Sequence, residues 1–294
     1  MQYLESFRLA SRDAEDAFVL SYPAKLEMSC YSDNVYPFKL FPQKEMPTLS
    51  FSPITVFYGG NGSGKSTLLN IIAEKLGLVR EAPFNRTPYY EDYLALCSYR
   101  LSYGKKPPKG SRIITSDDVF DYLLDIRALN EGVDRKREAL FAEYDKLTEL
   151  RDEPVLLASL DEHEAFKRML EAKRKSKSAF VSRELPREKR TRSNGESAFY
   201  YFTEKIREGA LYLLDEPENS LSVKLQGELA SFIADSARFY DCQFIISSHS
   251  PFFLSLHGAR VYDLDSVPVT EKKWTELENV RLLYDFFRAN EEFF

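Results

Sequence analysis

One glycine-rich stretch, Gly59–Thr67, constrains this chain more than any other; it reads G-G-N-G-S-G-K-S-T. It contains the spacing G-x-x-x-x-G-K-S, which is typical of a P-loop that wraps phosphate groups. Wrapping requires successive backbone N–H groups to turn inward, and residues without a Cβ allow that path. The residues predicted to bind the phosphates are Gly59, Gly60, Asn61, Gly62, Ser63, Gly64, Lys65, Ser66 and Thr67.

The segments on either side of this loop fit a strand–loop–helix unit. Ile54–Tyr58 is β-branched and aromatic, as in a buried strand, and Ser66–Leu76 reads as a helix closed by Gly77. Because this helix begins at the loop, its N-terminal dipole and free N–H groups favour an anion there. We expect Lys65 to bring a charge to the β- and γ-phosphates and the Ser66 hydroxyl to ligate Mg²⁺.

Two further stretches combine an apolar strand with polar residues at its end. Residues 210–217 predict a buried strand that ends in Asp215 and Glu216, and residues 244–251 predict another that ends near His249. In α/β sheets, ligands bind at the carboxyl ends of strands. We therefore expect Asp215 to hold Mg²⁺, Glu216 to accept a proton from the attacking water, and His249 to hydrogen-bond a γ-phosphate. The predicted catalytic residues are Lys65, Glu216 and His249.

A fourth polar segment, Ser193–Ser197, opens an amphipathic helix. Polar side chains and a glycine at a helix start form an anion site, although an ordinary capped surface helix has the same pattern. The chain already has a P-loop for its own nucleotide, so a second such site makes sense if it faces the nucleotide of another copy. The predicted contacts are Ser193, Gly195 and Glu196.

Together these residues resemble the motifs of ABC-class ATPases. Gly59–Thr67 is similar to their Walker A motif, and Leu211–Glu216 to Walker B with its catalytic glutamate. Ser193–Ser197 resembles their signature in the short S-x-G-E form of the SMC and RecF branch, and His249 the switch histidine. The resemblance covers residues 45–80 and 190–260, and the wider chain is similar to small stand-alone bacterial ATPases of this class.

The chain departs from the class at two places. The segment that resembles the D-loop, Glu218–Ser222, ends in Ser222 where the class has Asp, and no Q-loop glutamine is evident. Asp117 stands at the position where that glutamine is expected, which makes it a third candidate metal ligand beside Ser66 and Asp215.

The resemblance implies an α/β fold, a P-loop NTPase with an ABC-type ATPase head: a mixed central sheet flanked by helices, plus a helical insertion. We expect a P-loop lobe over 1–129, a charged helical insertion over 130–192, and a lobe with the signature, Walker B and switch histidine over 193–294. Local patterns add a strand over Tyr3–Leu9, a turn over Arg12–Asp16, a strand or short helix over Tyr93–Tyr103, and a helix N-capped by Ser116. Tyr36, Phe38 and Phe41 are candidates to stack on a base, but core packing is the favoured explanation.

Charge is unevenly distributed. The whole chain carries −6, yet residues 167–192 hold eleven Lys or Arg against three Glu, a local net charge of +8. This pattern fits either a solvated helical face or an electrostatic footprint for DNA or another polyanion. Cys30, Cys97 and Cys242 match no disulfide or metal spacing, and no apolar run is long enough to span a bilayer. We expect a cytoplasmic protein without a membrane partner.

These features predict ATP binding and Mg²⁺-dependent ATP hydrolysis by a homodimer that sandwiches the nucleotides. Closure of that dimer would act as a switch or clamp on DNA or on an effector protein partner, in repair or phage defence. Two alternatives stay open: the nucleotide-binding subunit of a membrane transporter, and a binding module that uses ATP with little turnover.

Overall fold

The computed structural model describes residues 2–20, 35–102, 106–149, 176–182 and 193–294. The chain divides into two compact units. The first contains residues 1–120 and 193–294, and the second contains residues 121–192.

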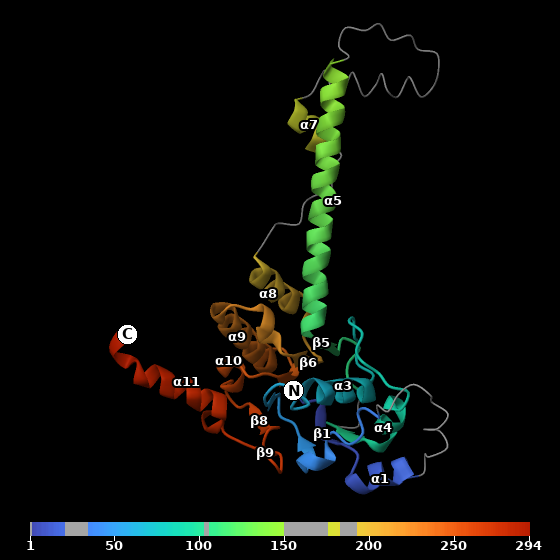
Figure 1. Cartoon of the computed structure of the whole chain (residues 1–294), viewed down its shortest axis with the longest axis vertical. Coiled ribbons are helices and arrows are strands. Elements are labelled where there is room, and N and C mark those ends of the chain that lie inside the picture. The colour runs from blue at the N-terminus through green and yellow to red at the C-terminus, as the bar shows by residue number, and fades with distance from the viewer. Residues whose placement is uncertain (1, 21–34, 103–105, 150–175, 183–192) are drawn as a thin grey trace. The chain divides into compact units, whose positions relative to one another are not determined.

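A six-stranded sheet forms the centre of the first unit (Figure 1). Its order is β5 (Arg112–Ile114), β6 (Leu211–Asp215), β7 (Gln243–Ser247), β3 (Ile54–Tyr58), β8 (Arg260–Asp263) and β9 (Thr270–Glu271). The first five strands are parallel and β9 is antiparallel, so the predicted mixed central sheet is confirmed. Because the carboxyl ends of parallel strands share one edge, Asp215 of β6 lies in register with Ser247 of β7.

A smaller antiparallel sheet accompanies the central one. It has the order β2 (Leu49–Ser50), β1 (Leu4–Arg8) and β4 (Ser98–Leu101), which confirms the predicted first strand. Helix α3 (Lys65–Leu76) contacts β5, β6 and β7, and its apolar side chains are buried in a core that includes residues of both sheets. The buried α3 residues of this core are Leu68, Leu69, Ile71, Ile72 and Ala73. The helix that begins at the glycine-rich loop is therefore anchored in the main core.

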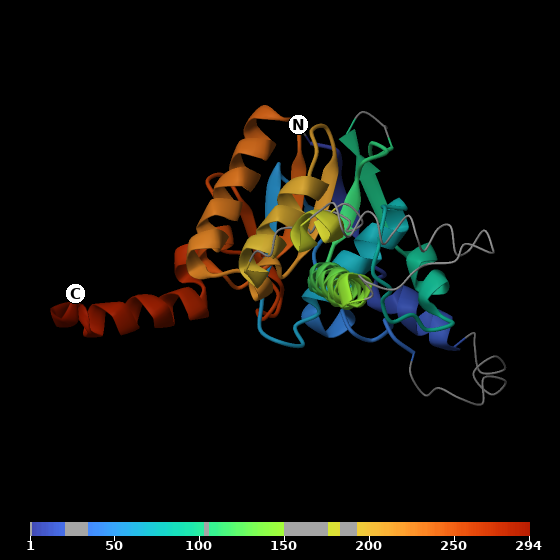
Figure 2. The same cartoon turned by 90° about the horizontal axis from the view of Figure 1, so that it is seen from above.

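Three helices of the chain after residue 193 pack together. They are α8 (Asn194–Lys205), α9 (Val223–Phe239) and α10 (Pro251–Leu254). Helix α9 contacts α8, α10 and β7, and Figure 2 shows α8 and α9 side by side. The described 3₁₀ turns are η1 (Pro42–Lys44), η3 (Pro217–Ser220), η4 (Trp274–Glu276) and η5 (Glu291–Phe293). Cys97 and Cys242 are buried free thiols, whereas Cys30 lies outside the described residues.

Two local predictions need correction. The prediction of a turn over Arg12–Asp16 is wrong, because this segment forms helix α1 (Arg12–Leu20). Ser11 Oγ accepts the Ala14 N–H at 3.2 Å, which caps this helix, and acidic residues occupy its first turn. The Tyr93–Tyr103 segment was predicted as a single element, but it divides between α4 (Tyr90–Leu96) and β4.

The predicted N-cap of the long helix is also wrong by one residue. Helix α5 (Ser116–Glu149) is capped by Thr115, whose Oγ1 accepts the Asp118 N–H at 3.3 Å. The Asp118 carboxylate accepts the Thr115 N–H at 2.6 Å in return, a reciprocal arrangement that favours Thr115 over Ser116. Asp118 also accepts the Ala82 N–H at 2.6 Å, so it fixes the start of α5 to the loop that follows α3.

Within the second unit, α5 packs against α7 (Lys177–Ser182). Leu140 of α5 and Phe180 and Val181 of α7 form a small buried cluster, and Lys177 pairs with Asp145 at 2.6 Å. Of the predicted basic stretch 167–192, only residues 176–182 belong to the described part of the chain.

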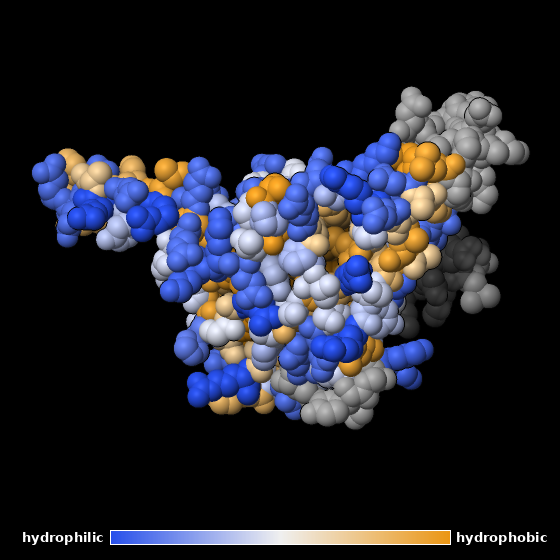
Figure 3. Space-filling model, turned by 90° about the horizontal axis from the view of Figure 1, so that it is seen from below, coloured by the Kyte–Doolittle hydropathy of each residue, from blue (hydrophilic) through white to orange (hydrophobic). Residues whose placement is uncertain are grey.

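Helix α11 (Glu278–Ala289) is the last α-helix of the described chain and has an exposed, mixed surface. Leu282, Tyr284, Phe286 and Phe287 are all more than half exposed. In the space-filling view of Figure 3, apolar and hydrophilic residues alternate along this helix. No helix among the described residues has both the length and the apolar character that a bilayer span requires.

Candidate functional site

The P-loop forms a tight turn between β3 and α3. Gly62 and Gly64 adopt φ values of +80° and +93°, which L side chains rarely take. A Cβ on Gly59 would lie 2.6 Å from Ser63 Oγ and 2.8 Å from Ser63 Cβ. The N–H of Gly60 donates to Asp265 Oδ2 at 2.7 Å, so a residue that follows β8 anchors the entrance of the loop. The sequence pattern carried no signal for Asp265.

A Gly59→Ala variant tests how closely the loop is packed. The added methyl group would displace Ser63 and distort the turn, so we expect nucleotide affinity to fall by at least about tenfold, or about 1.4 kcal/mol. The measurement is titration with a fluorescent nucleotide analogue. Gly132→Ala is the matched control, because nothing lies within 4 Å of its Cβ position. Wild-type affinity in folded Gly59→Ala would contradict the prediction.

Lys65 is buried at the first turn of α3 and is fully engaged by its own chain. Its Nζ donates to the carbonyl oxygens of Gly59 at 2.7 Å and Gly60 at 3.0 Å. It also lies 3.3 Å from Glu216 Oε1, with only 3% of the lysine side chain exposed. The structure therefore brings the lysine and the carboxylate together, and a phosphate would have to replace these partners.

Asp215 and Ser66 bring two oxygen ligands together. Ser66 Oγ donates to Asp215 Oδ1 at 3.0 Å, and Ser247 Oγ donates to the same oxygen. Burial raises the pKa of Asp215, although the hydrogen bonds from Ser247 and Ser66 oppose that rise. A carboxylate beside a hydroxyl suits a hard cation such as Mg²⁺. The role of Ser247 was missed because only the register between β6 and β7 places it there.

Glu216 stands in a constrained position at the end of β6. Its φ of 46° is in the left-handed region, which is uncommon for a non-glycine residue and costs free energy. Its N–H donates to Ser247, and its Oε2 accepts from Asn219 Nδ2 at 2.9 Å. Burial raises the pKa of Glu216, but the Asn219 hydrogen bond and the Lys65 charge outweigh it and hold the pKa below its usual range.

His249 follows β7 at the same edge of the sheet. Its N–H donates to Glu218 Oε1 at 2.8 Å, and its imidazole Nε2 lies 3.9 Å from that oxygen. Burial raises the pKa of the Glu218 carboxyl. The imidazole itself is partly exposed, with 31% of the side chain accessible.

The predicted signature residues form a capping box at the start of α8. Glu196 N–H donates to Ser193 Oγ at 3.3 Å, and the Glu196 carboxylate accepts from the Ser193 N–H and hydroxyl, each at 2.9 Å. Glu196 therefore orients Ser193. A Cβ on Gly195 would lie 3.1 Å from Leu225 and 3.6 Å from the Ser220 carbonyl oxygen, which shows that this glycine packs closely against the segment after β6.

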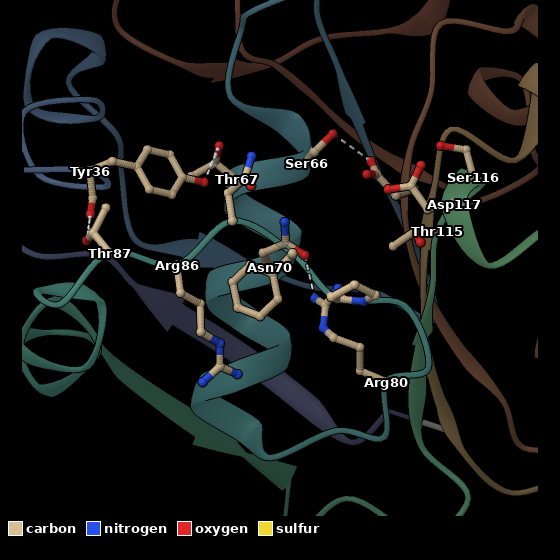
Figure 4. Close-up of a pocket in the computed structure, with 14 residues that line it drawn as sticks. Tyr36, Ser66, Thr67, Asn70, Arg80, Arg86, Thr87, Thr115, Ser116 and Asp117 are labelled. Carbon is tan, nitrogen blue, oxygen red and sulfur yellow. Dashed lines mark hydrogen bonds between the residues drawn. The ribbon is translucent and has the colours of Figure 1, made fainter. Parts of the chain in front are cut away.

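A cavity of ≈ 750 Å³ opens beside the first turns of α3 (Figure 4). The predicted metal ligands Ser66, Asp117 and Asp215 all line it. The remaining lining residues are Tyr36, Thr67, Asn70, Arg80, Pro83, Phe84, Asn85, Arg86, Thr87, Thr115 and Ser116. The volume of this cavity is within the range of small-molecule sites.

The wall formed by residues 80–87 was not foreseen. Arg80 and Arg86 both pair with Glu74, and both guanidinium groups lie over the Phe84 ring, at 4.3 Å and 4.7 Å. These residues follow no helical or strand period, so the sequence carried no signal for them.

The three aromatic candidates for base stacking lie in different surroundings. Phe38 and Phe41 are buried in the core. Tyr36 lines the cavity and donates its hydroxyl to Thr67 Oγ1 at 3.0 Å. Of the three, only Tyr36 is therefore placed beside the P-loop cavity.

Comparison with known proteins adds a family match. Residues 111–255, just under half of the 294-residue chain, match a family described as "AAA domain, putative AbiEii toxin, Type IV TA system". None of the curated proteins compared with the chain matches it.

Several solved structures are similar to the chain at low identity. One is the Smc head domain of Pyrococcus furiosus with an extended coiled coil bound to the C-terminal domain of ScpA: 15% identity, TM-score 0.42, covering 98% of this chain and 100% of that chain. Another is the SMC head domain from Thermotoga maritima, with 14% identity and a TM-score of 0.33. The match covers 77% of this chain and 92% of that chain. A third is an ATP-binding cassette in a dimeric post-hydrolysis state bound to ADP and Pi, with 14% identity and a TM-score of 0.35. The match covers 78% of this chain and 90% of that chain.

At these scores the likeness to ABC-class ATPases rests on the motifs and on the family match. The family match spans β5 to α10, which includes the segments that resemble the signature, Walker B and switch histidine. The P-loop precedes this region and meets it at Lys65 and Glu216. Residues 111–255 thus match an AAA-domain family, and the motifs of the chain resemble those of P-loop ATPases of the ABC class.

Proposed function

We propose that this chain binds ATP with Mg²⁺ and hydrolyses it to drive head-to-tail closure of a homodimer. One observation carries the proposal: the P-loop and the end of β6 supply complementary groups at a single place. Lys65 Nζ lies 3.3 Å from Glu216 Oε1, and Ser66 Oγ lies 3.0 Å from Asp215 Oδ1. A cation for phosphate, a carboxylate base and two oxygen ligands for a metal are the groups that phosphoryl transfer needs.

Each residue has a separate role in the proposed reaction. Lys65 would exchange its carbonyl partners for the β- and γ-phosphates, and Glu216, kept ionised by Asn219 and Lys65, would accept a proton from the attacking water. His249 would donate a hydrogen bond to the γ-phosphate. Ser66, Asp215 and Asp117 would hold Mg²⁺, which neutralises charge on the phosphates.

The dimer follows from the second anion site. Ser193 and the Gly195 N–H would contact the γ-phosphate bound by the partner copy, with Glu196 orienting the serine. A two-fold contact brings both helix starts to both nucleotides at once. We propose that the head comprises residues 1–129 and 193–294 and is interrupted by the insertion 130–192.

Opening and closing of this dimer would act as a switch or clamp on DNA or on an effector protein, in repair or phage defence, in the cytoplasm. The short signature at Ser193 and the charge of +8 over residues 167–192 support this reading. Gel shift with duplex DNA across a salt series tests the nucleic-acid half. The absence of binding at low salt would remove DNA as the partner.

The dimer is tested by sizing chromatography with and without ATP and Mg²⁺. A Glu216→Gln background should trap the nucleotide and elute as a dimer. We expect Ser193→Arg in that background to elute as a monomer while it still binds ATP through its own P-loop, because the bulky charge blocks only the contact to the partner. Ser231→Arg on α9 is the exposed control and should remain dimeric. Monomeric elution of Glu216→Gln with ATP would contradict the sandwich.

The same preparations separate the alternatives. Phosphate release that disappears in Glu216→Gln would exclude a module that uses ATP without turnover. Recovery bound to a membrane protein would favour a transporter subunit instead.

A further inference from the structure

A third acidic side chain lies close behind Asp215 and Glu216, and the proposed chemistry does not use it. Glu218 belongs to the 3₁₀ turn η3, and only 7% of its side chain is exposed. Burying a carboxylate is costly unless it is hydrogen-bonded, and a neutral side chain could fill the same space. The contacts of Glu218 therefore indicate the role of its carboxylate.

One carboxylate oxygen fixes the end of β7. Glu218 Oε1 accepts from Ser248 Oγ and from the His249 N–H, both at 2.8 Å. Ser248 Oγ in turn accepts the Ser250 N–H at 3.0 Å, so three consecutive residues are tied to this one side chain. The other oxygen, Oε2, is buried and has no hydrogen-bond partner among the described residues.

The turn that carries Glu218 also contacts two other parts of the site. Asn219 donates to Glu216 Oε2 at 2.9 Å. The Ser220 carbonyl oxygen lies 3.6 Å from the Cβ position of Gly195, at the start of α8. Three consecutive residues, Glu218–Ser220, thus contact the proposed catalytic carboxylate, the histidine and the segment that resembles the signature.

We propose that Glu218 is a positioning residue that sets the backbone of His249, so that the imidazole faces the γ-phosphate, without itself touching the nucleotide. The inference rests on the proposed ATP hydrolysis, because it assigns Glu218 a role through His249. Removing the carboxylate leaves the Ser248 hydroxyl and the His249 N–H without their acceptor, and the histidine is then free to shift. A displacement of about 1 Å at a reacting group can cost roughly 100-fold in rate.

The test is a double-mutant cycle in steady-state ATP hydrolysis. We expect Glu218→Ala to lower kcat by roughly 10- to 100-fold with little change in KM for ATP, and His249→Ala to lower it comparably. The double variant should be no slower than His249→Ala, because Glu218 acts only through that residue. Multiplying losses in the double variant would overturn the proposal. Glu218→Gln keeps an acceptor at Oε1 and should retain kcat within about threefold of wild type.

A purely structural role is separated by a matched variant. Glu15 is also a buried carboxylate, with one oxygen that accepts a backbone N–H (from Lys39, 2.6 Å) and another without a partner in the described chain. Glu15→Ala should lower the Tm and leave the kcat of the folded protein unchanged. A Glu218→Ala variant that behaves like Glu15→Ala would overturn the proposal. If Glu218→Ala does not fold, Ser248→Ala and Glu218→Gln provide the comparison.

Hydrogen exchange distinguishes failure of this inference from failure of the proposed function. The His249 amide, followed by NMR without nucleotide, should exchange at least roughly tenfold faster in Glu218→Ala than in wild type, because it loses its acceptor. If the wild-type protein does not hydrolyse ATP, the proposed function is refuted. The exchange rate of the His249 amide then still tests the inference about Glu218. Unchanged exchange at His249 would overturn the inference even if ATP is hydrolysed.

Discussion

Glu216→Gln should reduce multiple-turnover ATP hydrolysis by roughly 10²- to 10⁴-fold, the usual contribution of a general base. Glutamine keeps an oxygen that can accept from Asn219, so the local structure should survive. It cannot accept the proton of the attacking water. Because the variant also loses the 3.3 Å ion pair with Lys65, the lysine is freer to meet phosphate, and ATP affinity should be equal or higher.

Phosphate release and nucleotide titration measure the two effects separately. Glu204→Gln, on the exposed side of α8, is the control and should match wild type in both. Residual turnover within about threefold of wild type would remove Glu216 as the base.

Lys65→Ala should have the largest effect on binding. A hydrogen bond to a charged group contributes about 1.5–3 kcal/mol, so ATP affinity should fall by roughly 10- to 100-fold or more. The same change removes the charge that helps to hold the pKa of Glu216 low, so that pKa should rise toward its usual range. Isothermal titration with ATP and Mg²⁺ measures the affinity.

Lys224→Ala is the matched control for this variant. Lys224 is 86% exposed on α9 and pairs only loosely with Glu228, at 3.8 Å, so its removal should leave ATP affinity unchanged. Wild-type affinity in Lys65→Ala would mean that the P-loop does not hold the triphosphate.

The parts of the site that sequence predicted are those built from neighbours along the chain. The strand before Gly59, the helix after Gly64 and the Asp215–Glu216 pair at the end of β6 are each specified within about a dozen residues, by period and by backbone requirements. The mixed central sheet was expected from the resemblance to ABC-class ATPases, whereas its strand order was not predicted, since nothing local decides which strands pair.

The parts that were missed depend on contacts between distant segments. Ser247 meets Asp215 through strand register, and Asp265 reaches Gly60 from beyond β8. The helix α1 was missed because its cap, Ser11, lies just before a charged run that resembles a turn. At Thr115, two hydroxyl residues in succession compete to cap α5, and the reciprocal bond with Asp118 decides between them.

The partners of Lys65 within the chain link the binding of a nucleotide to the state of Glu216. The Lys65 ammonium contacts the carbonyl oxygens of Gly59 and Gly60 and the carboxylate of Glu216, so its charge is already balanced within the chain. A triphosphate that binds Lys65 would have to displace these partners. That displacement would free the Glu216 carboxylate to accept a proton from water. In the proposed reaction, nucleotide binding would therefore also free the Glu216 carboxylate, so that the base would become available only when a triphosphate is bound.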